Sequence, residues 1–129
     1  MTKYVIGPDV ALRLAGERAG VRAELVAPTL IRSQLLTLLF QAVRRGELTK
    51  QAADAQLNYV RGLRMRLLGD RVLQDVAWKI ADRLGWDDTY AAEYVALTQL
   101  QADAFITLDE RLANAARDVV TIAPIDALY

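Results

Sequence analysis

The sequence contains no cysteine and no histidine. The lack of cysteine excludes a disulfide framework, a thiol nucleophile and a zinc–thiolate site. The lack of histidine excludes a Ser-His-Asp triad and any imidazole ligand to a metal. A metal ion bound by this chain would therefore be held by oxygen atoms, which favours Mg²⁺ or Mn²⁺.

The chain also lacks an excess of charge and any long apolar run. Lysine plus arginine and aspartate plus glutamate number 16 each, so the formal net charge is zero and a nucleic-acid-binding face would have to be a local patch. The N-terminus does not read as a secretion signal and no apolar run reaches the length of a membrane span, so we expect a cytoplasmic protein with no membrane partner. The length of 129 residues predicts a single domain over residues 1–129.

Short apolar runs alternate with segments of helical periodicity. The apolar runs predict strands at Tyr4–Ile6, Leu25–Val26, Ala104–Leu108 and Val119–Ile122. Apolar spacing, caps and stops predict helices over residues 8–18, 28–45, 49–63, 70–84, 88–100 and 109–117. Short buried strands separated by helices indicate a parallel sheet with helices on both faces, which is a three-layer α/β/α fold of the α/β class.

Asp109 is the best candidate for a functional side chain. It directly follows the apolar segment Ala104–Leu108 and precedes the helical segment Glu110–Ala113. Ligands of open α/β sheets bind outside the carboxyl ends of the strands, where this side chain is expected to lie. The structural alternative is that Asp109 caps the helix that follows it.

Four stretches of the sequence, taken in order, resemble a known family. They are Lys3–Ile6, Ala27-Pro28 leading into Leu35-Leu36, Tyr90–Leu97 and Phe105–Leu112. Together they resemble the PIN-domain family, and especially the VapC-type toxins of bacterial toxin–antitoxin pairs. The resemblance implies a PIN-like fold with a short parallel sheet and Mg²⁺-dependent endoribonuclease activity by phosphodiester hydrolysis. It also implies a cognate antitoxin as partner and a homodimer.

The resemblance places the acidic positions of the family on this sequence. They correspond to Gly7 after the first strand, Gln34 in the long second helix, Ala91 in the helix that continues Tyr-Val-Ala-Leu, and Asp109, with Thr107 two residues before it. Of these positions only Asp109 keeps a carboxylate. Glycine and alanine offer no ligating side chain and glutamine offers only a neutral oxygen, so the acidic site is degenerate and Mg²⁺ binding is expected to be weak.

Neighbouring acids can compensate for these losses. Asp9 lies two residues after the first acidic position, and Asp88 lies three residues before the third, with Asp87 beside it. We predict a relocated metal site formed by Asp9, Asp88 and Asp109. The structural alternatives are that Asp9 interacts with a helix dipole and that Asp88 or Asp87 is an N-cap.

Two neutral side chains complete the predicted catalytic set. Gln34 would supply an amide oxygen, and Thr107 would orient a ligand or a water molecule. The alternative for Gln34 is a buried amide whose hydrogen bonds are satisfied by the backbone.

Two stretches suggest binding surfaces. The segment with Leu57, Tyr59, Val60, Leu63 and Met65 has more apolar bulk than a monomer needs to expose, which predicts a homodimer or antitoxin contact there. A basic patch for RNA phosphates could form from Arg44, Arg45, Arg61, Arg64, Arg66 and Arg71. The alternative for these arginines is a set of solvated helix ends.

Three functional hypotheses remain open on the sequence. The first is a VapC-type toxin with a degenerate acidic site that cleaves RNA slowly or not at all. The second is a catalytically inactive PIN-like protein that binds RNA or a protein partner. The third is an interaction module with no role in nucleic-acid chemistry.

Overall fold

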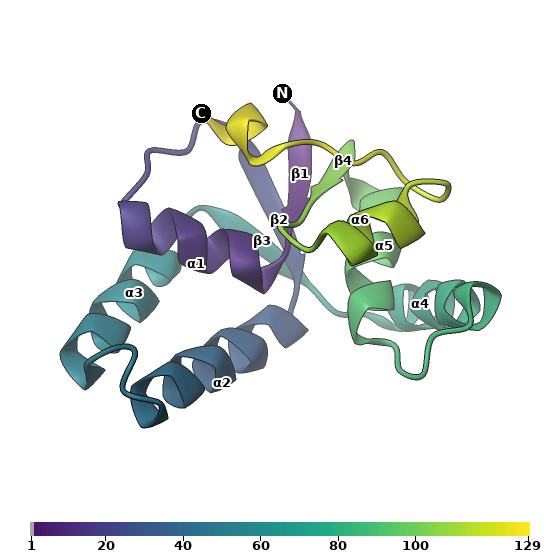
Figure 1. Ribbon diagram of the computed structural model, residues 1–129. Coiled ribbons are helices and arrows are strands. Elements are labelled where there is room, and N and C mark those ends of the chain that lie inside the picture. Colours follow the sequence, from purple (N-terminus) through teal and green to yellow (C-terminus); the bar gives the residue numbers. More distant parts are fainter. Residues whose placement is uncertain (1) are drawn as a thin grey trace.

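A parallel sheet forms the centre of the computed structural model, which describes residues 2–129 (Figure 1). Its strands, in the order β3-β2-β1-β4, are β1 (Lys3–Ile6), β2 (Glu24–Pro28), β3 (Met65–Leu68) and β4 (Ala104–Ile106). The helices are α1 (Pro8–Glu17), α2 (Leu30–Arg44), α3 (Lys50–Gly62), α4 (Arg71–Leu84), α5 (Tyr90–Gln101) and α6 (Glu110–Ala116). A 3₁₀ helix, η1, covers Ile125–Leu128 near the C-terminus.

Every strand pair in the sheet is parallel. Val5 pairs with Phe105 across β1 and β4, and the backbone N–H of Gly7 donates to the carbonyl of Ile106 at 3.1 Å. The carboxyl ends of these strands therefore meet at one edge of the sheet. Gly7 and the segment that leads from β4 to Asp109 therefore lie at the same edge, as expected for a parallel sheet.

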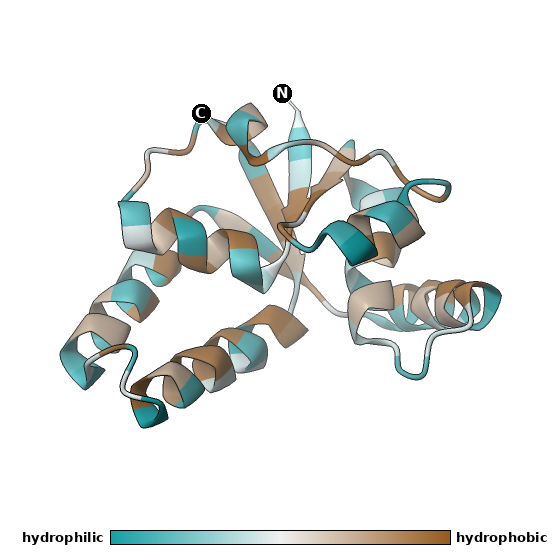
Figure 2. Ribbon diagram, in the orientation of Figure 1, coloured by the Kyte–Doolittle hydropathy of each residue, from teal (hydrophilic) through white to brown (hydrophobic). Residues whose placement is uncertain are grey.

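The helices cover both faces of the sheet, as the sequence predicts for a three-layer α/β/α fold. Helices α1, α2 and α3 contact one another on one side, whereas α4 packs against α5, which contacts β1, β2 and β4 (Figure 1). The brown, apolar part of the sheet lies at its centre, whereas β1 begins with hydrophilic residues (Figure 2). Burial on both faces explains this pattern, because a central parallel strand has no solvated side.

The core lies between the sheet and the two helical layers. Val5, Ile6, Phe105 and Ile106 are fully buried in the strands, and Leu14 meets them from α1. Each such side chain contributes about 1.5–3 kcal/mol by leaving water. The sheet and its flanking helices are therefore held together mainly by apolar burial.

Several helix ends match the capping signals of the sequence. Thr49 Oγ1 accepts from the N–H of Ala52 at 3.0 Å, and Asp70 Oδ1 accepts from the N–H of Leu73 at 2.9 Å. Gly85 ends α4 with a φ of 70°, a left-handed conformation that glycine adopts without strain. These side-chain and glycine signals fix where α3 begins and where α4 begins and ends.

The strand predictions need correction at four places. The sequence analysis missed β3, because Arg66 interrupts its apolar run and the strand lies half exposed at the sheet edge. The expected strand Val119–Ile122 forms only an isolated bridge between Ile122 and Phe105, and β4 ends at Ile106. Pro28 closes β2 instead of opening α2.

Two residues of the expected apolar interaction face pack within the subunit, and the contact of the other residues with a partner stays a prediction. Val60 is buried within the subunit, and the hydroxyl of Tyr59 donates to the carbonyl of Ala19. Leu57, Leu63 and Met65 are half-buried and line a groove. The most exposed large apolar side chains lie elsewhere, with Phe40 at 64% and Trp78 at 72% exposure.

None of the helices within residues 2–129 combines the length and apolarity that a membrane span requires.

Candidate functional site

Asp9 lies at the carboxyl ends of β1 and β4 and links them. Pro8 starts α1 and places Asp9 in its first turn. Oδ2 of Asp9 accepts a hydrogen bond from Thr107 Oγ1 at 3.1 Å and another from the N–H of Leu108 at 2.9 Å. Oδ1 accepts from the N–H of Val10 at 2.8 Å. Both oxygens of this carboxylate are therefore occupied by donors of the protein itself.

The Asp9 carboxylate also occupies the space beside Gly7. A Cβ added to Gly7 would lie 2.7 Å from Asp9 Oδ1, closer than carbon and oxygen can approach without movement. The negative charge that the resemblance places at residue 7 is thus supplied next to that position by residue 9. That Asp9 replaces the missing acid as a metal ligand stays a prediction.

Thr107 joins Asp9 to Asp109. While its hydroxyl donates to Asp9, its oxygen accepts from the N–H of Asp109 at 3.1 Å. Asp109 Oδ1 accepts from the N–H of Leu112 at 3.1 Å and caps α6. The structural alternative for Asp109, a helix cap, is therefore confirmed, and the residue is exposed.

Gln34 is held by Tyr94, a residue that the sequence analysis did not select. The hydroxyl of Tyr94 donates to Gln34 Oε1 at 2.5 Å, so a side chain and not the backbone satisfies this amide oxygen. Tyr94 is only 3% exposed, and its ring lies 6.0 Å from that of Phe105. Tyr94 follows Ala91 by three residues on α5, and this spacing puts both on one helix face. The spacing from Ala91 could therefore have identified Tyr94 as a residue of the candidate site.

Burial and nearby charge keep Tyr94 protonated. Burial raises the pKa of the Tyr94 hydroxyl well above its ordinary value, and the negative charges of Asp9 and Glu93 raise it further. Tyr94 therefore acts as a hydrogen-bond donor and not as a base.

Asp88 is engaged locally at the start of α5. It is exposed, and its Oδ1 accepts from the N–H of Tyr90 at 3.1 Å. Thr89, not Asp88, is the N-cap residue, and its side chain makes no capping hydrogen bond. The expected N-cap at Asp87 or Asp88 is therefore wrong by position, although the carboxylate of Asp88 does bond to the first turn.

The predicted metal ligands do not form one group. Within residues 2–129 no three acidic side chains are placed so that they could hold one ion together. The carboxylates near the strand ends are those of Asp9 and Asp109, and both oxygens of Asp9 already accept hydrogen bonds from the protein. Because Mg²⁺ requires near-octahedral oxygen ligands, these residues do not fit a preformed Mg²⁺ site.

A shallow apolar depression adjoins Gln34. It has a volume of about 540 Å³ and is lined by Pro8, Leu30, Ser33, Gln34, Thr37, Leu38 and Tyr90. Ser33, Gln34, Thr37 and Tyr90 carry polar groups, but most of the exposed wall is apolar and no lining side chain is positively charged, so the depression suits an apolar side chain better than a phosphate. The surface beside the strand ends is therefore apolar next to α2 and acidic at Asp9 and Asp109.

Solved structures of similar fold fit this architecture. The crystal structure of PAE2754 from Pyrobaculum aerophilum matches with a TM-score of 0.79 at 18% identity, over 98% of this chain and 91% of that chain. VapBC2 from Rickettsia felis, bound to a DNA fragment from its promoter, matches with a TM-score of 0.65 at 8% identity, over 95% and 98%. Neither a family model nor a curated protein sequence matches the chain. The similarity shows a PIN-like fold.

Proposed function

We propose that this chain is a VapC-type PIN-like protein that acts by binding a protein partner. Its acidic site binds Mg²⁺ weakly and cleaves RNA slowly or not at all. The observation that carries this proposal is the state of Asp9, whose oxygens accept from Thr107, Leu108 and Val10 while no three acids gather around one point within residues 2–129. Donors of the protein itself therefore meet the negative charge of Asp9.

Weak ion binding follows from the ligands that remain. An incoming Mg²⁺ ion would compete with the donors of Val10, Thr107 and Leu108 for the lone pairs of Asp9, and it would gain few carboxylates in return. Hydrogen bonds to a charged acceptor contribute about 1.5–3 kcal/mol each, so their loss opposes ion binding. An ion with few protein ligands keeps more of its own water shell and activates water less.

A protein partner and a homodimer are the second part of the proposal. The structurally similar VapBC2 of Rickettsia felis is named as a complex, which supports an antitoxin partner for a chain of the same fold. Exposed Leu36 and Phe40 on one face of α2 provide an apolar contact for a second copy. An exposed apolar patch of this kind marks an interaction site more often than an isolated apolar residue does.

A specific observation supports residual ribonuclease activity as a second candidate. Asp9 and Asp109 are joined through one hydroxyl group, that of Thr107, at the carboxyl ends of adjacent strands. Substrate phosphate could complete the ligands of an ion held by these carboxylates. Slow cleavage that requires Mg²⁺ would be the result.

Metal titration and RNA assays separate these functions. Isothermal titration calorimetry with Mg²⁺ should give a weak isotherm, and RNA incubated with Mg²⁺ should be cleaved little more than RNA in EDTA. RNA binding measured in EDTA then distinguishes an RNA-binding protein from one that binds protein partners alone. Tight Mg²⁺ binding with rapid cleavage would contradict the proposal.

A further inference from the structure

We infer that the outer edge of β3 and the groove beside it bind an extended segment of a partner protein, in which apolar and acidic side chains alternate. The inference rests on the proposed partner-binding function and names the chemistry of the partner segment. Three independent features support it: an open strand edge, an apolar groove and a set of arginines without acidic partners.

The open strand edge is that of β3. The opposite edge strand, β4, is covered by the segment that follows α6. The N–H of Phe105 donates to the carbonyl of Thr121 at 2.9 Å, and the N–H of Ala123 donates to the carbonyl of Phe105 at 3.0 Å. On β3, the carbonyl of Leu68 accepts from Thr29 N–H at 3.0 Å, on the β2 side. Such an uncovered edge is a template for pairing with another strand.

Alternation along β3 decides which backbone groups are free. Because backbone groups of successive strand residues point to opposite sides, Leu68 and Arg66 face β2, whereas Met65 and Leu67 face outward. Met65 N–H is satisfied by the carbonyl of Leu63 at 2.9 Å. Within residues 2–129, the N–H of Leu67 donates to no acceptor outside the sheet. This donor and the neighbouring outward carbonyls can pair with an added strand.

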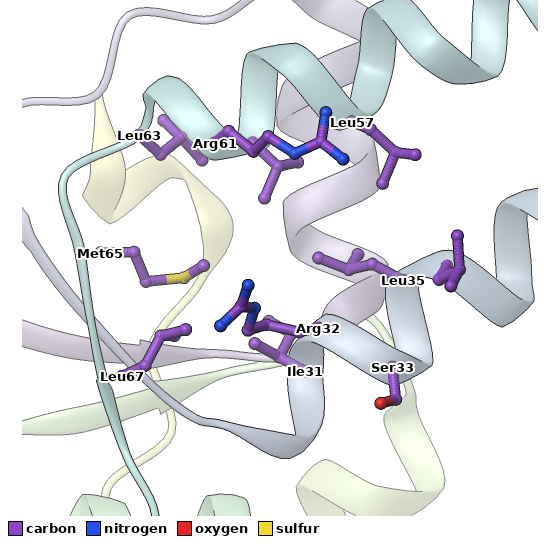
Figure 3. A pocket seen from close by; sticks show the side chains of 11 residues that line it. Ile31, Arg32, Ser33, Leu35, Leu57, Arg61, Leu63, Met65 and Leu67 are labelled. Atoms are coloured by element: carbon purple, nitrogen blue, oxygen red, sulfur yellow. The ribbon is translucent and has the colours of Figure 1, made fainter.

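An apolar groove runs beside this edge, between β3, α2 and α3 (Figure 3). Its volume is about 470 Å³. Its apolar wall consists of Ile31, Leu35, Leu36, Leu57, Val60, Leu63, Met65 and Leu67. Since Met65 and Leu67 also belong to β3, an added strand would place every second side chain on the groove side.

Cations surround the edge and the groove. Arg32 and Arg61 line the groove, and Figure 3 shows both guanidinium groups beside its apolar side chains. Arg64 and Arg66 line a second depression of about 390 Å³ on the other side of β3. The acid lining that second depression is Glu24, which faces Lys3 as well as the arginines.

These arginines are not neutralised within the subunit. In the described part of the chain the ion pairs join Arg45 to Glu47 and Lys50 to Asp54. Arg61 bonds only to the neutral amide oxygen of Asn58, at 3.0 Å. A partner strand with carboxylates beside its apolar residues would therefore gain electrostatic complementarity as well as backbone hydrogen bonds.

The groove favours a peptide over RNA. Sequence-tolerant binding of single-stranded RNA relies on aromatic side chains that stack on bases. No aromatic side chain lines the groove or the second depression. The arginines alone could contact phosphates, but the apolar wall between them would stay without a partner.

Fluorescence anisotropy with designed peptides tests the inference on the full chain. The probe is a labelled peptide of alternating valine and glutamate, and its control replaces glutamate with lysine. We expect the glutamate peptide to bind at least about tenfold more tightly, a difference of about 1.4 kcal/mol. The double variant Arg61→Glu/Arg66→Glu should reverse this preference. Arg83→Glu, an exposed charge reversal on α4, should leave it unchanged.

Hydrogen exchange locates the bound peptide. Saturating glutamate peptide should slow exchange at the amide of Leu67, and this measurement needs no variant that could misfold. The inference is overturned by equal binding of both peptides, by no binding of the glutamate peptide, or by binding without protection of β3. It is also overturned if oligouridine RNA binds at this site more tightly than the peptide.

The two levels of the proposal fail separately. If the glutamate peptide does not bind and the unaltered chain still cleaves RNA poorly in Mg²⁺, only the docking inference fails. If the chain cleaves RNA rapidly, the proposed function fails whatever the peptide does.

Discussion

The carboxylate of Asp9 lies in the space that a side chain at Gly7 would need, with Oδ1 only 2.7 Å from the position of a Cβ on that glycine. A carboxylate at residue 7 and the present conformation of Asp9 therefore exclude each other. Asp9 instead connects α1 to the segment after β4, because its carboxylate accepts hydrogen bonds from Thr107 and Leu108. The acid beside the strand ends thus has a structural role that does not depend on an ion.

Replacing Asp9 should lower stability. Asp9→Asn keeps the size of the side chain but removes the charge that Thr107 and Leu108 donate to. We expect the free energy of unfolding to fall by about 1–2 kcal/mol in urea denaturation. Asp88→Asn is the matched control, because Asp88 is exposed and bonds only to its own helix start. Equal effects of the two changes would contradict the linking role of Asp9.

The capping role of Asp109 can be separated from any role in binding an ion. Asp109→Ala removes the acceptor for the N–H of Leu112 and should destabilise the protein by about 0.5–2 kcal/mol. Asp109→Asn keeps an oxygen acceptor, so it should cost less. Thermal unfolding of both variants measures the difference. If both lose the same stability, the cap does not explain the effect.

Glu93 should make stability depend on pH in the acid range. Burial raises the pKa of its carboxyl above the ordinary value, so the folded state holds this proton more tightly than the unfolded chain does. Below the unfolded pKa Glu93 is neutral in both states and does not lower stability. As the pH rises through the folded pKa, the buried carboxyl becomes charged and the free energy of unfolding falls. Glu93→Gln should therefore stabilise the protein at pH 7 more than at about pH 3.5.

Urea denaturation at both pH values tests the effect of Glu93, with Glu110→Gln as the control. Glu110 is exposed at the start of α6. A gain from Glu93→Gln that is the same at both pH values would contradict the assignment to burial of the charge.

Self-association should depend on α2. Phe40 is 64% exposed and follows Leu36 by one helical turn, so Phe40→Glu should shift the chain toward monomer in sedimentation velocity. Trp78→Glu offers a matched control, because Trp78 is 72% exposed but lies on α4. A chain that is monomeric at all concentrations would contradict the homodimer. If Trp78→Glu dissociates the dimer and Phe40→Glu does not, the dimer contact lies on α4 and not on α2.

The sequence predicted the parts of the fold that depend on periodicity and caps. Strands Tyr4–Ile6 and Ala104–Ile106 are short, apolar and followed by helices, so their parallel pairing could be expected. Thr49 and Asp70 are residue types that favour the N-cap, so the starts of their helices could be predicted. The strand β3 could not be predicted in this way, because an edge strand with an exposed arginine lacks the continuous apolar run of a buried one.

The candidate site was predicted only in part for a related reason. Asp109 and Thr107 follow a strand directly, so their position could be expected from the chain order. The contact of Asp9 with Leu108 joins residues 99 apart in sequence, and the bond of Tyr94 to Gln34 joins residues 60 apart. Such pairs depend on how α1, α2 and α5 pack, which local patterns do not encode.

Restoring the missing acids tests the central claim most directly. The geometry at Gly7 requires that Asp9 change with it, so the variant combines Gly7→Asp and Asp9→Ser with Gln34→Glu and Ala91→Asp. RNA cleavage with Mg²⁺ is measured side by side for the unaltered chain, this variant, and this variant carrying Asp109→Asn. We predict little cleavage by the unaltered chain, at least about a tenfold gain on restoration, equivalent to about 1.4 kcal/mol of barrier, and loss of that gain with Asp109→Asn. Rapid Mg²⁺-dependent cleavage by the unaltered chain, left intact by Asp9→Asn, would contradict the account.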